Sequence, residues 1–392
     1  MSKLYPSPLL VAVSLHFIIF SILGISRHLG YMTSINDLGC FDQVLWNIIH
    51  NNFPLNTSVF SQPINWFSFH FHPILYFFVP FYYLIPTVNW FIFTQSAALS
   101  VAALPIFLLA KQVTNSEKQA LLWGLIYLFN PFVLNADAWD FHPICLAVPF
   151  IALNFLAVEQ QKPWLFASAN IVLLLCQEQF GLTVACFGLL YGLKNKEVYV
   201  SSLFLMLGVV SVIFILTIAM PSLSPTNQHL MFGNHSGNNA HLSRYTWLGH
   251  SLKEVISTLV FSPVYVFQRV LFEFHGLFYL RFLLLPVLFT ALAAPLFMLP
   301  ITPDLLANIL AANPLPRSIY SYHSVAIIPV LTTAAIYGCQ KIYRYCSLLP
   351  PKKLTSCICG VTIIWGYLFA PLPLPFAENI WHPVQLIAKY DP

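Results

Sequence analysis

The sequence predicts an all-α, polytopic protein whose helices cross a membrane. Of its 392 residues, 58% are hydrophobic and only 8% are charged, whereas roughly a quarter of a soluble globular domain is charged. The mean hydropathy is +0.75, and apolar runs of about 17–25 residues, the length that spans a bilayer, recur along most of the chain. We therefore do not expect a soluble protein. No basic cluster accompanies the net charge of +4, so we do not expect nucleic acid as a partner.

The first apolar run, from Pro8 to about Arg27, predicts the first transmembrane helix. It is longer than the apolar core of a typical signal peptide, and no small-x-small cleavage site follows it. We therefore expect a retained helix that delivers the next loop to the outer side. The eight cysteines are scattered, with no spacing typical of a zinc site or a disulfide framework.

Later apolar runs predict the rest of a single membrane domain over residues 1–371, with about 11 crossings in all and a range of about 9–13. One net crossing is expected within 73–111, and the others at about 119–135, 142–158, 164–177, 179–193, 198–220, 254–272, 277–299, 324–340 and 354–371. Basic loops after alternate crossings predict a cytoplasmic N-terminus. This parity makes a piece near 73–88 re-entrant or interfacial, and it places the loop 221–250 and the short tail 372–392 outside.

The first outer loop, residues 28–72, contains a predicted amphipathic helix over residues 38–50. Asp42, Trp46 and His50 follow one face at four-residue steps. Apolar residues follow the opposite face at three- and four-residue steps, namely Leu38, Phe41, Val44, Leu45, Ile48 and Ile49. The pattern predicts a helix that lies flat on the bilayer with its polar side up.

Scarce ionisable residues collect at the outer ends of the predicted helices. Such groups are costly within a bilayer and usually face a cavity or a partner. Their collection on one side therefore predicts one outward-facing polar pocket. The residues are Asp37, Asp42, His70, His72, Asp137, Asp140, His142, Glu178, Asp304, Arg317 and His323.

Several of these residues have two interpretations. Asp37 precedes the amphipathic helix as a capping residue does, and Asp42 fits a solvated polar face. Either carboxylate could instead be a general base or a metal ligand. His70 and His72 could share a metal ion, or backbone groups could satisfy them. The segment Gln177–Gln179 interrupts an apolar run, either as a surface turn or as part of a polar site.

Two other groups point to ligand binding. The segment Asp137–His142 holds two acids and a histidine in a loop that is too short to serve only as a solvated linker. Arg317, together with Tyr322 and His323, offers guanidinium and phenol donors that suit a phosphate. The alternative for this second group is an aromatic belt with an anchoring arginine.

Four motifs together resemble the membrane protein family called domain of unknown function 2079. They are Asp-Leu-Gly-Cys-Phe-Asp-Gln-Val-Leu-Trp-Asn at 37–47, His-Phe-His-Pro at 70–73, Asp-Phe-His-Pro at 140–143 and Tyr-His-Ser at 322–324. The resemblance covers about Ser34 to Ile336. That family is in turn similar to the polytopic GT-C glycosyltransferases, which use lipid-phosphate sugars. The resemblance implies a GT-C-like fold in which Asp37 takes the place of the catalytic acid at the start of the juxtamembrane helix.

The same resemblance assigns further positions. His72-Pro73-Ile74-Leu75 is similar to a His-Pro-Pro-Leu motif of those enzymes, and Asp140 resembles their second outer-loop acid. Two positions depart from the pattern, because Gln177 stands where relatives often have Lys, and Leu38 stands where they have Glu. The expected phosphate contact would then fall to Arg317 or Arg244.

These observations lead to the hypothesis of a membrane glycosyltransferase that moves a sugar from a polyprenyl-phosphate donor to an acceptor hydroxyl with inversion. The catalytic residues would be Asp37, as general base, with Asp42 and Asp140. The substrate-binding residues would be His70, His72, Asp137, His142, Gln177, Glu178, Arg317, Tyr322 and His323. If a divalent cation (Mg²⁺ or Mn²⁺) takes part, Asp37 and Asp140 would hold it. No other cofactor is expected.

The expected partners are the lipid bilayer, the polyprenyl-phosphate sugar and a glycan, lipid or protein acceptor. The expected location is a prokaryotic plasma membrane, with the active-site loop outside. Two other classes stay open: a transporter or flippase of a lipid-linked or small polar substrate, and a noncatalytic membrane assembly protein. A transporter normally places charges or broken helices near the middle of the membrane, where this sequence has few acids.

Overall fold

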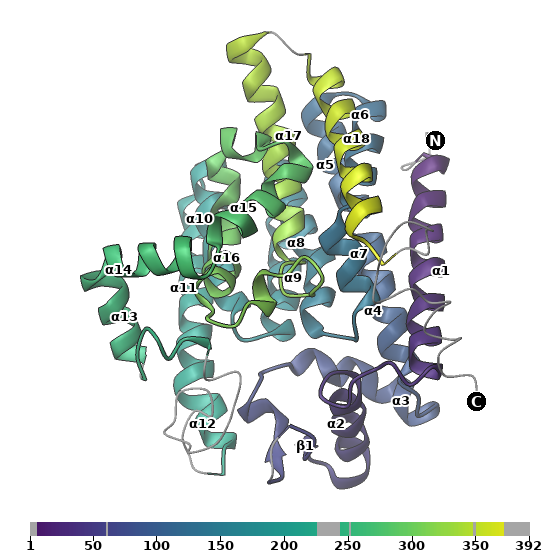
Figure 1. The fold of residues 1–392 in the computed structure, drawn as a ribbon, viewed down its shortest axis with the longest axis vertical. Coiled ribbons are helices and arrows are strands. Elements are labelled where there is room, and N and C mark those ends of the chain that lie inside the picture. The colour runs from purple at the N-terminus through teal and green to yellow at the C-terminus, as the bar shows by residue number, and fades with distance from the viewer. Residues whose placement is uncertain (1–5, 60–61, 226–243, 251, 348–349, 372–392) are drawn as a thin grey trace.

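The computed structural model describes residues 6–59, 62–225, 244–250, 252–347 and 350–371, and their regular structure is almost entirely helical (Figure 1). The α-helices are α1 (Ser7–Leu29), α2 (Leu38–Asn51), α3 (Val79–Leu84), α4 (Asn89–Val101), α5 (Ala103–Thr114), α6 (Glu117–Leu128), α7 (Pro131–Ala138), α8 (Pro143–Gln160), α9 (Pro163–Cys176), α10 (Phe180–Asn195), α11 (Val198–Phe214), α12 (Met220–Leu223), α13 (Leu252–Phe261), α14 (Pro263–Gln268), α15 (Gly276–Leu284), α16 (Thr302–Leu310), α17 (Ile327–Cys346) and α18 (Pro351–Phe369). The short 3-10 helices are η1 (Trp66–Ser68), η2 (Pro73–Phe78), η6 (Leu285–Val287), η7 (Thr290–Ala293), η8 (Pro295–Ile301) and η9 (Leu315–Arg317), and the π-helical turns are η3 (Ile215–Ala219) and η5 (Arg269–Glu273). Two strands, β1 (Leu55–Asn56) and β2 (Ile64–Asn65), pair antiparallel, with Leu55 opposite Asn65.

Four helical stretches among these residues are long and apolar enough to cross a membrane: Ser7–Leu29, Asn89–Thr114, Pro143–Gln160 and Val198–Leu223. Two bent pairs raise the number to six if each pair counts as one span. The number of helices that are long and apolar enough to cross a membrane is therefore smaller than the about 11 crossings expected from the sequence. One reason is that several predicted crossings are shorter apolar helices, such as Pro163–Cys176 and Gly276–Val287.

Prolines account for the broken spans. The predicted crossing at 119–135 bends by 47° where α7 begins at Pro131, and the one at 254–272 bends by 90° where α14 begins at Pro263. Proline lacks the N–H that would continue the preceding helix, and its ring clashes with the preceding turn. The run predicted at 277–299 does not form one continuous helix, because α15 gives way to short 3-10 turns around Pro286 and Pro295. Leu288 and Phe289, between these turns, have positive φ angles of 48° and 57°.

The amphipathic helix forms as predicted, since α2 covers Leu38–Asn51. Its apolar face, however, packs against protein. The Phe41 ring lies 5.2 Å from the ring of Phe141 and 5.5 Å from that of Trp66, and Val44 and Leu45 are fully buried. Burial in the protein core therefore explains the periodicity that the sequence alone attributed to a bilayer surface.

The first outer loop gathers at one end of the bundle. Figure 1 shows α1 running from the N-terminus toward the end that carries α2, α3 and β1, while the long helices α17 and α18 extend toward the opposite end. The 73–111 region holds one long stretch, Asn89–Thr114, preceded by the short apolar helix Pro73–Leu84. This arrangement brings residues 36–72 over the ends of the central helices.

Candidate functional site

A cavity of about 520 Å³ lies where distant segments of the chain meet. Residues of the segments 36–59, 66–72 and 142–144 line it together with segments 177–179, 244–245, 304–308 and 322–323. The lining residues are Asn36, Asp37, Cys40, Phe41, Ser58, Val59, Trp66, Phe69, His70, His72, His142, Pro143, Ile144, Gln177, Glu178, Gln179, Arg244, Tyr245, Asp304, Ala307, Asn308, Tyr322 and His323. Eight of the twelve residues assigned to the site from sequence are therefore neighbours: Asp37, His70, His72, His142, Gln177, Glu178, Tyr322 and His323.

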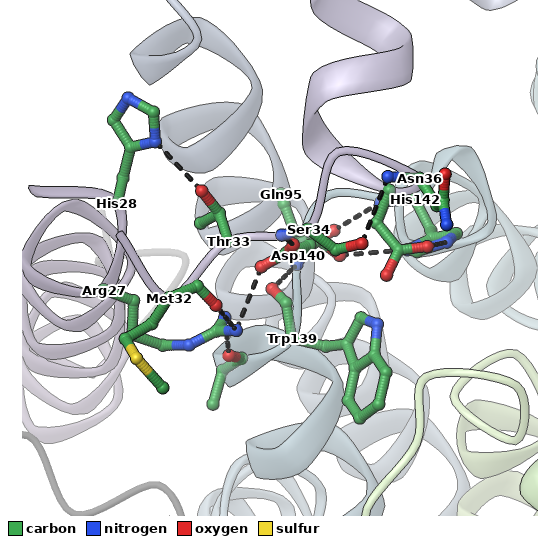
Figure 2. Close-up of polar contacts among 12 residues, drawn as sticks. Arg27, His28, Met32, Thr33, Ser34, Asn36, Gln95, Trp139, Asp140 and His142 are labelled. Atoms are coloured by element: carbon green, nitrogen blue, oxygen red, sulfur yellow. Dashed lines mark hydrogen bonds and ion pairs between the residues drawn. The ribbon is translucent and has the colours of Figure 1, made fainter. Parts of the chain in front are cut away.

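A buried ion pair supports the wall that carries Asp37 (Figure 2). Arg27, in the last turn of α1, places Nη2 3.0 Å from Oδ1 of Asp140, and their side chains are only 4% and 2% exposed. The backbone N–H of Ser34 donates to Oδ2 of Asp140 at 2.6 Å, and Arg27 also donates to the carbonyl of Met32 at 3.2 Å. Burial raises the pKa of the Asp140 carboxyl, and Arg27 opposes that rise. The pair fixes residues 32–34 just before Asp37.

Asp37 faces the cavity beside His142. It stands at the N-terminus of α2, but its side chain makes no capping hydrogen bond there, so the simple capping interpretation does not hold. Its Oδ1 lies 3.4 Å from Nε2 of His142. Nδ1 of His142 lies 3.0 Å from the carbonyl oxygen of Asp140, which can only accept, so Nδ1 carries a proton. A second proton on Nε2 turns the Asp37–His142 contact into an ion pair.

Aromatic rings continue this wall. The ring of His142 stacks on Tyr322 with centroids 3.5 Å apart, and Tyr322 stacks on His323 at 4.1 Å. The main-chain N–H of His142 also donates to Oε1 of Gln95 at 2.9 Å. The position of the imidazole beside Asp37 is therefore held by contacts on three sides.

A second polar corner forms around Glu178, where the chain leaves α9 and enters α10. Gln177 is extended, with φ −166° and ψ 152°, which breaks the apolar run. Nδ1 of His70 donates to Oε1 of Glu178 at 3.0 Å, and the N–H of Phe71 donates to Oε2 at 3.0 Å. The segment forms a turn between α9 and α10, and these contacts join it to the segment 70–71 at the cavity.

Sequence reasoning placed Asp304 among the residues of the polar pocket but gave it no catalytic or binding role, and it named Arg244 only as a substitute phosphate contact. Asp304 is the only acidic residue between Glu273 and Glu378, which was a usable signal. It is buried at the cavity, Gln179 donates a hydrogen bond to it, and burial raises its pKa to about 6. Arg244 makes no salt bridge with any residue for which the structure gives a position. Arg244 is therefore a cavity-lining cation without a partner carboxylate among the described residues.

Four of the predicted site residues have other partners and do not line the cavity. Asp42 accepts a hydrogen bond from the Tyr82 hydroxyl. Asp137 lies between helices, where the Ser96 hydroxyl donates to its Oδ1 at 2.7 Å and Nδ1 of His16 lies 3.4 Å from its Oδ2. The other two are Asp140, engaged by Arg27, and Arg317, which donates to the carbonyls of Asn308 and Ala311. The partners of Asp42, Asp137 and Asp140 come from distant parts of the chain, which the sequence alone cannot reveal, so it assigned these side chains to the pocket.

The residues do not fit the expected Mg²⁺ or Mn²⁺ site at Asp37 and Asp140. The Arg27 guanidinium and the Ser34 N–H already occupy the Asp140 carboxylate, and that carboxylate is outside the cavity. Ligand atoms of His70, His72 and Glu178 do lie within 4.8 Å of one another. Two imidazoles with one carboxylate suit zinc better than the oxygen-preferring Mg²⁺ or Mn²⁺.

Fold and cavity together define a helical membrane protein with a polar site formed by the segments 36–59 and 66–72 and the ends of several helices. Residues 28–387 match the family described as "Predicted membrane protein (DUF2079)", and the chain belongs to that family. The family resemblance expected from the four motifs is thus confirmed. No curated protein and no solved structure matches the chain.

Proposed function

We propose that the protein is a membrane glycosyltransferase that moves a sugar from a polyprenyl-phosphate donor to an acceptor hydroxyl within this cavity. The proposal includes a GT-C-like arrangement of about 11 crossings, with the cavity on the outer side of a prokaryotic plasma membrane. The observation that carries it is the position of Asp37. This carboxylate faces a cavity that is also lined by Arg244, which has no salt bridge to any described residue, by two further carboxylates and by four amide side chains.

The reaction follows from these groups. Asp37 accepts the proton of the acceptor hydroxyl, whose oxygen attacks the anomeric carbon of the sugar from the side opposite the phosphate. The bond between the anomeric carbon and the phosphate oxygen breaks, and the lipid phosphate leaves with the electron pair. Arg244 stabilises the charge on that phosphate. The result is a new glycosidic bond with inverted configuration.

The volume and lining of the cavity support this substrate class. About 520 Å³ is within the usual range for small-molecule sites, about 300–1,000 Å³. Glu178 and Asp304 supply acceptors for sugar hydroxyls, and Gln177 and Asn308 supply amides that both donate and accept. The Tyr322 ring, stacked between His142 and His323, holds the His142 imidazole at the wall of this cavity.

Transport of a polar substrate is a second candidate function, favoured by one set of observations. Two candidate spans are bent pairs, by 47° and 90°. In addition, Asp137 and His16 form a buried polar contact between α7 and α1. Broken helices and intramembrane ionisable groups are typical of transporters. Uptake of labelled substrate into proteoliposomes, set beside a sugar-transfer assay, separates the two functions.

The matched variants Asp37→Asn and Asp42→Asn test the proposal. Both remove one carboxylate from the same helical segment, but only Asp37 faces the cavity. We expect Asp37→Asn to lower sugar transfer by about 100-fold or more, as loss of a general base does, while Asp42→Asn retains most of it. Transfer is measured in vesicles with a panel of labelled polyprenyl-phosphate sugars, beside expression and thermal unfolding. Full transfer by well-folded Asp37→Asn would remove the proposed base.

A further inference from the structure

The His72 side chain has an unusual hydrogen-bond arrangement at the cavity wall. Its Nδ1 lies 3.2 Å from the indole Nε1 of Trp66. An indole N–H can only donate, so Nδ1 of His72 must present its lone pair. A neutral imidazole with a lone pair on Nδ1 carries its proton on Nε2. Trp66 therefore selects the tautomer of His72.

The proton on Nε2 has no acceptor. His72 is 3% exposed, and its Nε2 is buried without a hydrogen-bond partner among the residues that the structure describes. Burial lowers the pKa of His72 well below its ordinary value, and the neighbouring His70 and His142 lower it further. The side chain is thus a neutral donor, and a buried donor without an acceptor costs free energy unless a ligand supplies one.

Glu178 supplies a hydrogen-bond acceptor beside His72. Its two oxygens each accept one hydrogen bond, from His70 and from the N–H of Phe71. A carboxylate offers about four lone-pair sites, so it can accept more. A ring nitrogen of His72 and a carboxylate oxygen of Glu178 lie within 4.8 Å. With hydrogen bonds of about 2.8 Å, one oxygen atom can bridge two groups that far apart.

We propose that Trp66, His72 and Glu178 form a subsite for a neutral hydroxyl group of the ligand. The hydroxyl oxygen accepts the Nε2–H of His72, and the hydroxyl hydrogen is donated to Glu178. Naming this hydroxyl as one of the donor sugar rests on the proposed glycosyltransferase function.

Two other occupants fit less well. A metal ion on Nε2 needs a lone pair there, and Nδ1 would then carry a proton that faces the Trp66 N–H, whereas metal-bound histidines usually donate that proton to an acceptor. A phosphate would lie beside the carboxylate of Glu178, with Asp304 lining the same cavity. Only a group that both accepts and donates satisfies His72 and Glu178 together.

Nitrogen-15 NMR of histidine-labelled full-length protein tests the tautomer without any ligand. The His72 signals are assigned by difference with His72→Gln. We expect a neutral, Nε2-protonated imidazole at pH 7 that stays neutral at pH 5.5, and we expect Trp66→Phe to release this preference. A doubly protonated or Nδ1-protonated His72 in the wild type would overturn the inference, as would one equivalent of bound Zn²⁺ that His72→Gln abolishes.

Donor binding tests the hydroxyl. The probe is the polyprenyl-phosphate sugar that the protein binds best, with its monodeoxy analogues, measured on Asp37→Asn protein so that the donor is not consumed. Loss of one particular hydroxyl should weaken binding about tenfold, and this penalty should vanish in His72→Met but persist in His72→Gln, which keeps a donor. If the donor binds, and His72→Met loses as much affinity as the His72 protein for every deoxy analogue, only the subsite is overturned. If no polyprenyl-phosphate sugar binds, the proposed function fails with it.

Discussion

The buried pair between Arg27 and Asp140 gives the most quantitative prediction. Arg27→Met keeps the length of the side chain but leaves the Asp140 carboxylate, 2% exposed, without its cation. Removing one partner of a buried ion pair costs about 3–5 kcal/mol, because an uncompensated charge remains buried. We therefore expect Arg27→Met to lower the free energy of unfolding by about 3–5 kcal/mol, measured by denaturation in detergent micelles.

The double variant Arg27→Met/Asp140→Asn isolates the charge effect. Asparagine still offers an oxygen to the Ser34 N–H, but it carries no charge to leave unpaired. We expect the double variant to be more stable than Arg27→Met alone. The exposed pair Lys111–Glu117, with side chains 42% and 56% exposed, is the control, and Lys111→Met should cost at most about 1 kcal/mol. Equal losses for Arg27→Met and Lys111→Met would refute the argument, and so would a double variant less stable than Arg27→Met.

Three other predictions concern the cavity and the packing of the bundle. Asp304→Asn should remove a pH dependence. The folded-state pKa of about 6 exceeds the ordinary 3.8, so this group should cost the wild type about 2 kcal/mol of stability between pH 4 and pH 6, a loss that the variant should lack, as read from unfolding at both pH values. A larger loss in the variant would contradict this. Tyr322→Leu should lower sugar transfer several-fold with little loss of stability, because it removes only the ring stacked between His142 and His323. Unchanged sugar transfer by this variant would show that the ring is not part of the site. Gly338→Ala should lower the thermal midpoint of unfolding strongly, because a Cβ at this position would lie 1.9 Å from the carbonyl oxygen of Thr290. The control Gly360→Ala should leave the midpoint unchanged, because the space around Gly360 is open. Similar midpoints for the two variants would contradict the packing of α17.

The sequence predicted local elements well where a strong periodic signal exists. The helix at 38–50 appears as Leu38–Asn51, and the first apolar run appears as Ser7–Leu29. The same reasoning failed at 277–299, where hydropathy is high but prolines and two positive φ angles divide the run. Apolar composition reports burial in lipid or protein, and it does not by itself require a continuous helix.

The candidate site, like the fold, could be predicted from the sequence only in part. Scarcity of charge was enough to single out Asp37, His72 and Glu178, because each ionisable group in so apolar a chain needs a polar neighbourhood. Scarcity could not say which neighbour each group has. The sequence predicted Asp140 as a catalytic residue, whereas the structure shows it in an ion pair with Arg27. Such pairings join positions more than 100 residues apart, and no local pattern encodes them.

The most direct test of the central claim is an experimental structure of the protein with a polyprenyl-phosphate sugar bound. We predict density for the sugar phosphate in the cavity, with the phosphate at Arg244 and the anomeric carbon on the side of Asp37. A structure in which the headgroup binds elsewhere, and the Asp37 carboxylate contacts only protein, would contradict the account.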